Sequence, residues 1–197
     1  MPYEVTRRFE AALCEYTGAP FAVAVNSGTA ALLLACQAFP GRTTVTVPAR
    51  TYCSVPMAVI RAGHRVTMPE IAWRGAYRLD PLPVWDCARR FTSGMYRAGQ
   101  VQCLSFATTK ILGIEQGGAI LHDGSPALDR WFRRMRFDGR TEGVDPHAET
   151  FDLIGHHCIM LPSIAAQLLL KLHHLPRHNP DMGEHDYPDL SKQPAFR

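Results

Sequence analysis

A carboxylate, a hydroxyl and an amine follow one another at the ends of apolar runs in the middle of the chain. Asp86 ends one run, Ser105 ends the next, and Lys110 stands alone in the turn before a Gly-Gly pair. In an α/β sheet, ligands bind at the carboxyl ends of the strands, so this order predicts a lysine held opposite an acid. A lysine in partly dry surroundings has a lowered pKa and can act as a Schiff-base amine. A lone turn lysine is more often a solvated charge, so only the combination is specific.

A turn of small residues upstream offers a second group of candidates. Gly28 and Thr29 lead directly into the helix-forming run ALLLACQAF. The free N–H groups and the positive dipole at such a helix start suit a phosphate, although Ser27 and Thr29 could simply cap the helix. Neither GxxxxGK[ST] nor GxGxxG occurs, which disfavours a nucleoside-triphosphate or dinucleotide cradle. Tyr52, after a later strand, adds an aromatic ring at the same edge of the sheet.

Strands and helices that could position these groups alternate along the chain. Apolar runs and turn residues predict strands over 21–25, 43–47, 64–68, 83–86, 101–106 and 118–122. Apolar spacing and capping residues predict helices over 4–16, after the 26–29 turn, and over 52–62, 125–137 and 163–175. The alternation predicts a three-layer α/β/α fold with a mostly parallel sheet and right-handed crossovers.

The length of 197 residues suits one ordinary domain, which we expect over residues 1–175. Residues 176–197 contain four prolines and little periodicity, and we expect a tail that packs on the surface or on a partner. The polar N-terminus is no signal sequence and no apolar stretch is long enough to span a membrane, so the expected location is the cytoplasm. Six cysteines without a CxxC pair indicate reduced thiols rather than disulfides.

The net charge and the histidine content bear on three other kinds of partner, namely anionic ligands, nucleic acids and metal ions. The formal net charge of +3 permits an anionic ligand but falls short of a dedicated nucleic-acid binder. Arg130, Arg133, Arg134 and Arg136 are expected to form a solvated helix face; they could also receive a nucleotide phosphate, which makes them the best pointer to an anionic substrate. Clusters at 156–158 and 173–178 include histidines at helical spacing, but neither matches a zinc motif, so we predict no metal.

Several blocks of the sequence together resemble a known enzyme family. The blocks NSGTAALLLA, PARTYCSV, WDCARRF, SFATTK and EQGGAI are similar to successive motifs of the DegT/StrS sugar aminotransferases, which are fold-type-I pyridoxal phosphate enzymes. GHHCIMLPSIAAQLLLKLHHL further resembles the family's helix-entry block. The resemblance extends from about Glu4 to His178 and implies the large-domain fold of that family, with pyridoxal 5'-phosphate as cofactor.

The resemblance implies a role for each candidate residue. Lys110 would hold the cofactor as a Schiff base and later move the proton, and Asp86 would pair with the pyridinium nitrogen. Tyr52 would stack on the ring. The implied phosphate contacts are Gly28, Thr29 and Ser105. The family site is completed across a dimer, which implies a homodimer with shared sites in which His157 could reach the partner subunit's phosphate.

The sequence also departs from the family pattern. Arg89 replaces the usual Gln or His near the cofactor oxygen, Ile111 replaces a common Asn, and Gln116 takes a usual Glu position. Residues 68–84 are shorter than the corresponding family segment. We expect a reduced form of the family's large domain without the small C-terminal domain, which resembles compact members of the family, phage-encoded ones among them.

Three functions follow from these observations. The first is an aminotransferase that moves an amino group from an amino acid donor onto a keto sugar, with nucleotide-linked sugars as the expected substrates. The second keeps the cofactor but is a decarboxylase or lyase acting on an amino-acid-modified nucleotide or base. The third is a non-catalytic scaffold of the same fold, which the presence of both Lys110 and Asp86 argues against. We expect no membrane partner for any of the three functions, and a nucleic-acid partner is possible but not favoured.

Overall fold

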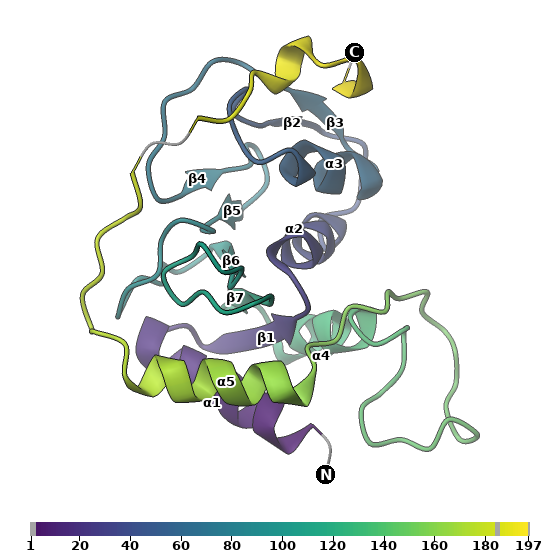
Figure 1. The fold of residues 1–197 in the computed structure, drawn as a ribbon. Coiled ribbons are helices and arrows are strands. Elements are labelled where there is room, and N and C mark those ends of the chain that lie inside the picture. The colour runs from purple at the N-terminus through teal and green to yellow at the C-terminus, as the bar shows by residue number, and fades with distance from the viewer. Residues whose placement is uncertain (1–2, 184–185, 197) are drawn as a thin grey trace.

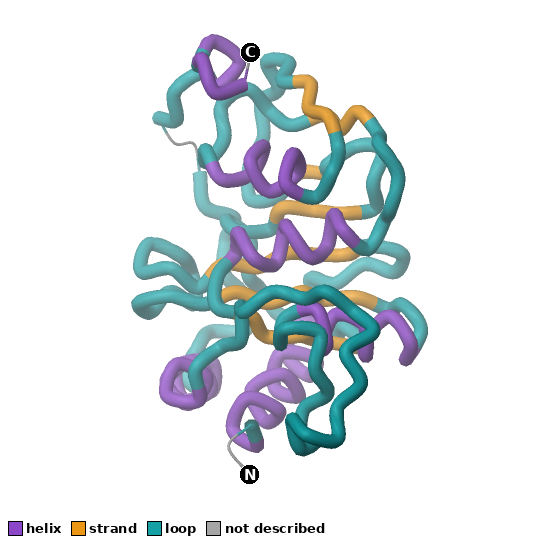
Figure 2. Tube along the Cα trace, turned by 90° about the vertical axis from the view of Figure 1, so that its right-hand side faces the viewer, coloured by secondary structure: helices purple, strands orange, loops and turns teal. Residues whose placement is uncertain are grey.

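A five-stranded sheet forms the centre of the computed structural model, which describes residues 3–183 and 186–196 (Figure 1). From one edge to the other the strand order is β1, β7, β6, β5, β4. The strands are β1 (Phe21–Val25), β7 (Gly118–His122), β6 (Val101–Ser105), β5 (Val84–Asp86) and β4 (Tyr77–Arg78). A second sheet contains β2 (Thr44–Thr46) and β3 (Arg65–Thr67), which lie beyond the β4 end in Figure 2.

The sheet is mixed, which differs from the mostly parallel sheet expected from the sequence. β5 and β6 are parallel, whereas β7 pairs antiparallel with both β1 and β6, and β4 pairs antiparallel with β5. Parallel neighbours need a long crossover, usually a helix. The segment 106–117 between β6 and β7 contains no helix, so β7 turns back beside β6. The expected helix crossover does join β2 to β3, which are parallel.

Helices cover both faces of the sheet, which confirms the expected three layers. Alternate strand residues on one face, including Val23 and Ile120, pack with the helices α2 (Gly28–Gln37), α3 (Ser54–Arg61) and α4 (Pro126–Met135). The other residues, including Ala24 and Leu121, pack with α1 (Glu4–Thr17) and α5 (Pro162–His173), which lie together below the sheet in Figure 1. Because both faces are buried, the strands are continuous apolar runs rather than alternating ones.

The helix boundaries follow the signals in the sequence. Ser27 caps α2, its Oγ accepting the Ala30 amide at 3.1 Å, and Ser125 caps α4 in the same way ahead of Pro126. Gly18, in the left-handed conformation at φ 80°, ends α1. No pattern in the sequence indicated β4 or the two short 3-10 helices, η1 (Leu190–Lys192) and η2 (Pro194–Phe196).

A buried ion network connects α1 to the segment that follows α4. The guanidinium of Arg136 is only 2% exposed and contacts Glu10 at 2.5 Å and Glu142 at 2.6 Å. Arg133 contacts Glu10 at 2.7 Å, and Arg7 contacts Glu142 at 2.6 Å. The solvated arginine face expected on α4 is therefore wrong for Arg136 and Arg133, because the carboxylates of α1 and of the following loop turn them inward.

The segment after α5 returns along the sheet to the opposite end of the molecule. In Figure 1 it runs from α5 past β4 to the neighbourhood of β2 and β3. Tyr16 donates to the Pro176 carbonyl at 2.6 Å near its start, and the Leu190 amide donates to the Ala49 carbonyl at 2.9 Å near its end. This segment therefore packs on the rest of the chain, while a division into a domain and a tail stays a prediction.

The remaining expectations concern membranes and thiols. Among the helices of the described residues, none has the length and apolar character that a membrane crossing requires. All six cysteines are free thiols, and four are buried. Burial raises the pKa of Cys36 to about 12 and that of Cys158 to about 11. These thiols are therefore protonated and unreactive near neutral pH.

Candidate active site

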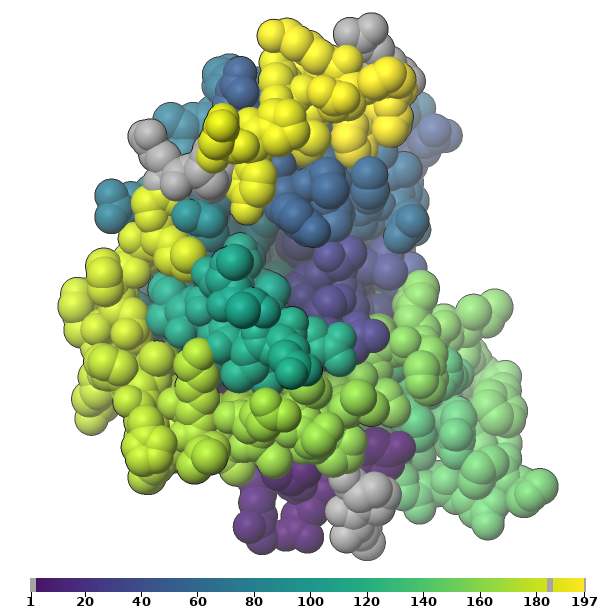
Figure 3. Space-filling view, viewed as in Figure 1, coloured from purple at the N-terminus to yellow at the C-terminus, as the bar shows by residue number. Residues whose placement is uncertain are grey.

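A cavity of about 370 Å³ opens where β5 and β6 end and α2 begins. Its walls also include the start of α3 and the 106–117 loop, and Figure 3 looks onto this hollow, with teal loop atoms below, blue α3 atoms above and purple α2 atoms at the back. The volume is within the range of small-molecule sites, roughly 300–1,000 Å³. Six predicted site residues line it, namely Gly28, Thr29, Tyr52, Asp86, Ser105 and Lys110.

Asp86 provides a buried carboxylate at the end of β5. It is 6% exposed and accepts hydrogen bonds from the Tyr77 hydroxyl at 2.8 Å and from the Ala88 amide at 2.9 Å. Burial raises the pKa of Asp86, although both hydrogen bonds and the charge of Lys110 act in the opposite direction. A cationic group in the cavity would restore the ionised form, so Asp86 is suited to bind a positive partner.

Tyr77 fixes the orientation of this carboxylate, and sequence reasoning missed it. Its hydroxyl lies 2.6 Å from the Thr51 hydroxyl as well as 2.8 Å from Asp86. Burial, followed by the charge of Asp86, raises the pKa of Tyr77 well above its usual value, so the phenol stays protonated and donates. Tyr77 belongs to a stretch without clear periodicity, and only the pairing of β4 with β5 places it opposite Asp86.

Lys110 is held in a tight turn after β6. Its backbone amide donates to the Ala107 carbonyl at 2.8 Å, and its carbonyl accepts the Gly113 amide at 2.8 Å. A Cβ at Gly113 would stand 2.5 Å from the Ala107 oxygen, so glycine is required for the turn to close. Burial lowers the pKa of Lys110, and nearby Arg89 lowers it further, whereas Asp86 raises it. The net lowering increases the neutral, nucleophilic fraction of the amine.

The start of α2 faces the cavity with hydrogen-bond donors. The first amides of a helix have no acceptor within the helix, and the Ser27 cap satisfies that of Ala30, which leaves the amides of Gly28 and Thr29 directed to this end. A Cβ at Gly28 would lie 2.8 Å from Ser105 Cβ, so glycine lets the helix start approach the end of β6. Thr29 Oγ1 lies 2.8 Å from the hydroxyl of Ser54, another residue that the sequence did not indicate.

Tyr52 lies at the mouth of the cavity. Its side chain is 56% exposed, and its ring meets the Tyr187 ring edge to face at a centroid distance of 6.2 Å. Tyr187 comes from the C-terminal segment and lines the cavity, as does Glu115 from the loop after Lys110. The sequence offered no signal for Tyr187, because it is 135 positions away from Tyr52 (187 minus 52) in a stretch without periodicity.

Arg89 and His157 are not among the cavity-lining residues. Arg89 lies beside the cavity, acts electrostatically on Lys110 and donates to the Gly183 carbonyl at 2.8 Å. The His157 side chain is 73% exposed, and its Nδ1 lies 2.7 Å from Asp138. Within this chain the His157 ring contacts Asp138 and does not line the cavity.

These residues fit the chemical groups of pyridoxal phosphate. A pyridine nitrogen needs an acid, which Asp86 offers from the cavity wall; an aldehyde needs an amine, which Lys110 offers from the facing loop. A phosphate needs N–H and hydroxyl donors, which the α2 start, Thr29 and Ser105 offer at one end. Within the described residues no group of three or more histidine, cysteine or acidic side chains is placed to hold a metal ion.

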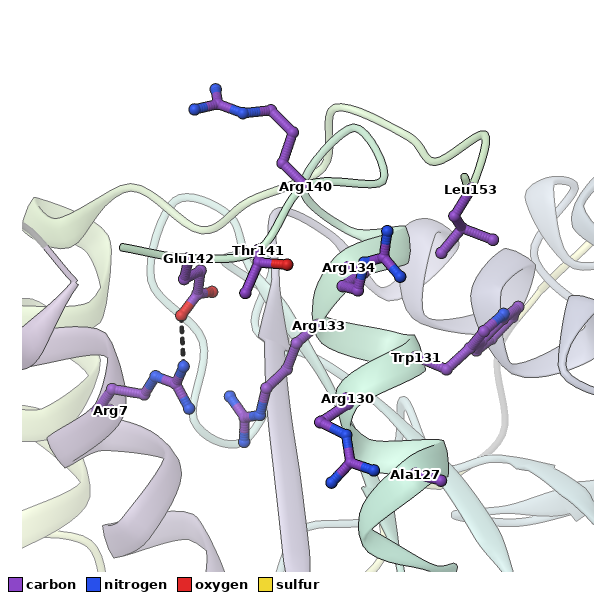
Figure 4. Close-up of a pocket in the computed structure, with 10 residues that line it drawn as sticks. All are labelled: Arg7, Ala127, Arg130, Trp131, Arg133, Arg134, Arg140, Thr141, Glu142 and Leu153. Atoms are coloured by element: carbon purple, nitrogen blue, oxygen red, sulfur yellow. Dashed lines mark hydrogen bonds and ion pairs between the residues drawn. The ribbon is translucent and has the colours of Figure 1, made fainter. Parts of the chain in front are cut away.

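A larger cavity of about 500 Å³ lies elsewhere and carries none of the candidate residues. It is lined by Arg7, Ala127, Arg130, Trp131, Arg133, Arg134, Arg140, Thr141, Glu142 and Leu153, drawn in Figure 4. Arg7 is paired with Glu142 (dashed in Figure 4), Arg133 with Asp129 and Glu10, and Arg134 with Asp152. Because carboxylates already compensate Arg7, Arg133 and Arg134, these three arginines are weak support for an anionic substrate.

Comparisons with known proteins agree with the fold and the order of the motifs. Residues 1–85 match the family model of the DegT/DnrJ/EryC1/StrS aminotransferase family, which confirms the resemblance over that part of the chain. No curated protein matches the sequence. Among solved structures, DesV of S. venezuelae is 24% identical with a TM-score of 0.69, and covers 87% of this chain.

Two further structures are similar. The sugar aminotransferase CalS13 from Micromonospora echinospora is 20% identical with a TM-score of 0.71 and covers 87% of this chain. PseC of Helicobacter pylori, an aminotransferase involved in pseudoaminic acid biosynthesis, is 18% identical with a TM-score of 0.72 and covers 88%. The chain in turn spans 57%, 60% and 58% of DesV, CalS13 and PseC. At these identities the likeness establishes the fold.

Proposed function

We propose that this protein is a pyridoxal-phosphate-dependent aminotransferase that transfers an amino group from an amino acid to a keto sugar. The observation that carries the proposal is that Asp86 and Lys110, from separate elements, line one cavity beside a helix start. When bound, the cofactor supplies an aldehyde for linking amines and a ring that withdraws electrons from the neighbouring carbon. The family match over residues 1–85 and the aminotransferase folds support the same function.

Each residue has a part that its surroundings favour. Asp86, oriented by Tyr77, holds the ring nitrogen in its cationic form. Lys110 would hold the aldehyde group of the cofactor through its amine, and the same amine, once the amino donor has taken its place, would move a proton at the substrate carbon. The start of α2 with Thr29 and Ser105 binds the phosphate, and Tyr52 covers the ring.

The substrate and the assembly are further parts of this proposal. A nucleotide-linked sugar rests on the family resemblance, because Arg133 and Arg134 of α4 are engaged in ion pairs. A homodimer is supported by the exposure of His157, which leaves its ring accessible to the partner subunit. The dimer would place that ring near the partner's phosphate-binding helix start.

A spectrum of the purified protein with pyridoxal phosphate tests the proposal. The chain contains only three lysines, so borohydride reduction followed by peptide mapping assigns any covalent link to one of them. We expect a reducible adduct on Lys110 in the parent, none in Lys110→Ala, and an unchanged adduct in Lys192→Ala, because Lys192 is 73% exposed and does not line the cavity. An adduct that persists in Lys110→Ala would remove Lys110 from its role.

The same sample distinguishes the reaction type. Addition of an amino acid donor should convert the cofactor stoichiometrically to its amine form, which a decarboxylase or lyase does not accumulate. Carbon dioxide or an eliminated group released without that conversion would favour the lyase. A parent protein that forms no adduct at all would favour a scaffold without catalysis.

A further inference from the structure

The C-terminal strap, defined as residues 181–183 and 187–190, is anchored on both sides of the cavity. On one side, the Asp181 carboxylate forms a two-pronged contact with Arg90 at 2.6–2.9 Å. A Cβ at Gly75 would stand 2.2 Å from that carboxylate, so the strap is packed closely there. The Met182 amide donates to the Arg89 carbonyl at 3.0 Å. This side of the strap therefore rests on the segment directly after Asp86.

The other side rests on the turn before Tyr52. Leu190 is buried, and its amide donates to the Ala49 carbonyl at 2.9 Å. The Tyr187 carbonyl accepts from the Arg50 guanidinium at 3.3 Å. Figure 3 shows the yellow C-terminal atoms lying over the blue atoms at the upper rim of the hollow. The strap thus bridges the two segments that carry Asp86 and Tyr52.

The Tyr187 side chain, which belongs to the strap, forms part of the cavity wall. It is half-buried, lines the cavity and meets the Tyr52 ring edge to face. Its charge when ionised would also raise the pKa of Tyr77, so the phenol group lies within electrostatic range of the Tyr77–Asp86 pair. Tyr52 is otherwise 56% exposed, and an exposed ring is free to leave the position in which it could cover a ligand.

We infer that Tyr187 is a positioning residue of the active site, which holds the Tyr52 ring over the cofactor and closes the open side of the cavity. This inference rests on the proposed function for the identity of the ligand. The strap residues on each side of Tyr187 are anchored by hydrogen bonds, which limits the movement of the Tyr187 ring. The contact between the two rings in turn limits the movement of Tyr52. Loss of the ring should therefore weaken cofactor binding without removing any group that reacts with it.

Absorbance titration with pyridoxal phosphate tests the inference. Borohydride mapping of the Lys110 adduct on the same samples tests the proposed function. Tyr187→Ala should raise the Kd about 2- to 10-fold, which is the value of one aromatic pair converted to affinity. Tyr187→Phe keeps the ring and should stay within about twofold of the parent. Phe196→Ala, an aromatic truncation in the same segment but outside the cavity, serves as the matched control and should also stay within about twofold.

The outcomes separate this inference from the proposed function. Equal Kd values for parent and Tyr187→Ala, with the Lys110 adduct present, would overturn the positioning role and leave the function intact. A Tyr187→Phe loss as large as that of Tyr187→Ala would overturn the ring contact. If the parent forms no adduct, the proposed function fails.

Amide hydrogen exchange provides a second readout, in the free protein and with the cofactor added. Peptides containing Met182 and Leu190 should be protected in the free protein, because both amides donate to fixed carbonyls. On addition of pyridoxal phosphate their protection should rise in the parent and rise less in Tyr187→Ala. Rapid exchange of both amides in the free parent would show that no anchored strap exists and would overturn the inference.

Discussion

Burial shifts the pKa values of Asp86 and Lys110 in opposite directions, and neighbouring groups in the cavity partly offset both shifts. Burial raises the pKa of the Asp86 carboxyl and lowers that of the Lys110 amine, so both side chains are shifted toward their neutral forms. A neutral amine is the reactive form for attachment to an aldehyde. A bound cationic ring would return Asp86 to its ionised form, so ligand binding and the charge of this carboxyl are coupled.

Arg89 contributes to this balance, and Arg89→Gln tests its part. Burial lowers the pKa of Lys110 most, and Arg89 lowers it further. Removal of the positive charge should raise the pKa of Lys110, so less amine is neutral at a given pH. We expect slower adduct formation at neutral pH and a pH midpoint moved upward, measured by stopped-flow absorbance. Glutamine removes the charge and keeps a polar N–H donor, although it is shorter than arginine, whose Nη2 donates to the Gly183 carbonyl.

The control for this prediction is Arg61→Gln, at the exposed end of α3. Arg61 does not contribute to the pKa of Lys110 or line the cavity, so its profile should match the parent. An Arg89→Gln midpoint that stays in place or moves to lower pH would contradict the electrostatic role.

Residue types and order were sufficient to predict six of the cavity-lining residues, because each follows a recognisable strand or opens a helix. Asp86 and Ser105 end apolar runs, and Gly28 opens a helix-forming run. Tyr77 and Tyr187 escaped prediction for a physical reason, because neither lies in a periodic stretch. Tyr77 reaches Asp86 only through the pairing of β4 with β5, and Tyr187 meets Tyr52 through a contact between segments far apart in the sequence. His157 and Arg89 were placed at the site by family likeness, and the chain alone does not bring them into the cavity lining.

At the scale of elements, ion pairs attach the 139–155 segment to α1, and the sequence alone did not indicate these pairs. Four arginines in and directly after α4 indicated a solvated face, yet Arg136 is buried against Glu10 of α1 and Glu142. Burial alone would raise the pKa of Glu142, but the attraction of Arg136 and Arg7 outweighs it and holds that pKa below its usual value. The network therefore stabilises the folded state when Glu142 is ionised.

Glu142→Gln should reduce the free energy of unfolding at pH 7 by about 1–3 kcal/mol, because buried Arg136 loses a charged hydrogen-bond partner. Since the pKa of Glu142 is lowered in the folded state, its contribution is complete above the ordinary glutamate pKa of about 4.3 and is lost as pH falls through the folded-state value. Urea denaturation at pH 7 and at progressively lower pH should therefore show the parent and the variant converging in acid.

Glu70→Gln is the matched control, because Glu70 forms an exposed pair with Arg50. It should change the free energy of unfolding by less than about 1 kcal/mol at either pH. A Glu142→Gln difference that is constant with pH would show that packing, rather than charge, holds the segment.

Element boundaries were predictable wherever a local signal marks them, while strand direction was not. β1 and β7 were predicted with their observed bounds, because small or turn-forming residues flank both runs. The direction of β7 depends on how the 106–117 loop returns, and that loop is shaped by close packing at Gly113 and Gly118, where a Cβ would meet backbone atoms at 2.4–2.6 Å. Such contacts are formed between segments and leave no periodic pattern in the sequence.

At the scale of the whole molecule, the open question is whether one chain forms a complete site. The start of α2 offers amides and hydroxyls for a phosphate, but the chain supplies no cation to the cavity lining beyond Lys110 among the described residues. Apolar side chains on the segments around His157 are also exposed, including Phe151 at 65%, Ile154 at 94% and Leu161 at 51%. Apolar side chains left exposed along one stretch of the chain suit a surface that meets another subunit.

The proposed homodimer with shared sites therefore makes a prediction about mixtures of two inactive chains. Lys110→Ala and His157→Ala should each lose aminotransfer, yet co-refolding them should restore activity, because a two-fold dimer of one chain of each kind contains one site with both residues intact. Random pairing would restore about a quarter of the parent's sites. The measurement is the amino-donor half reaction, with each variant alone as control and sedimentation to establish the dimer. Recovery equal to the sum of the separate variants would show that Lys110 and His157 do not act across a subunit boundary.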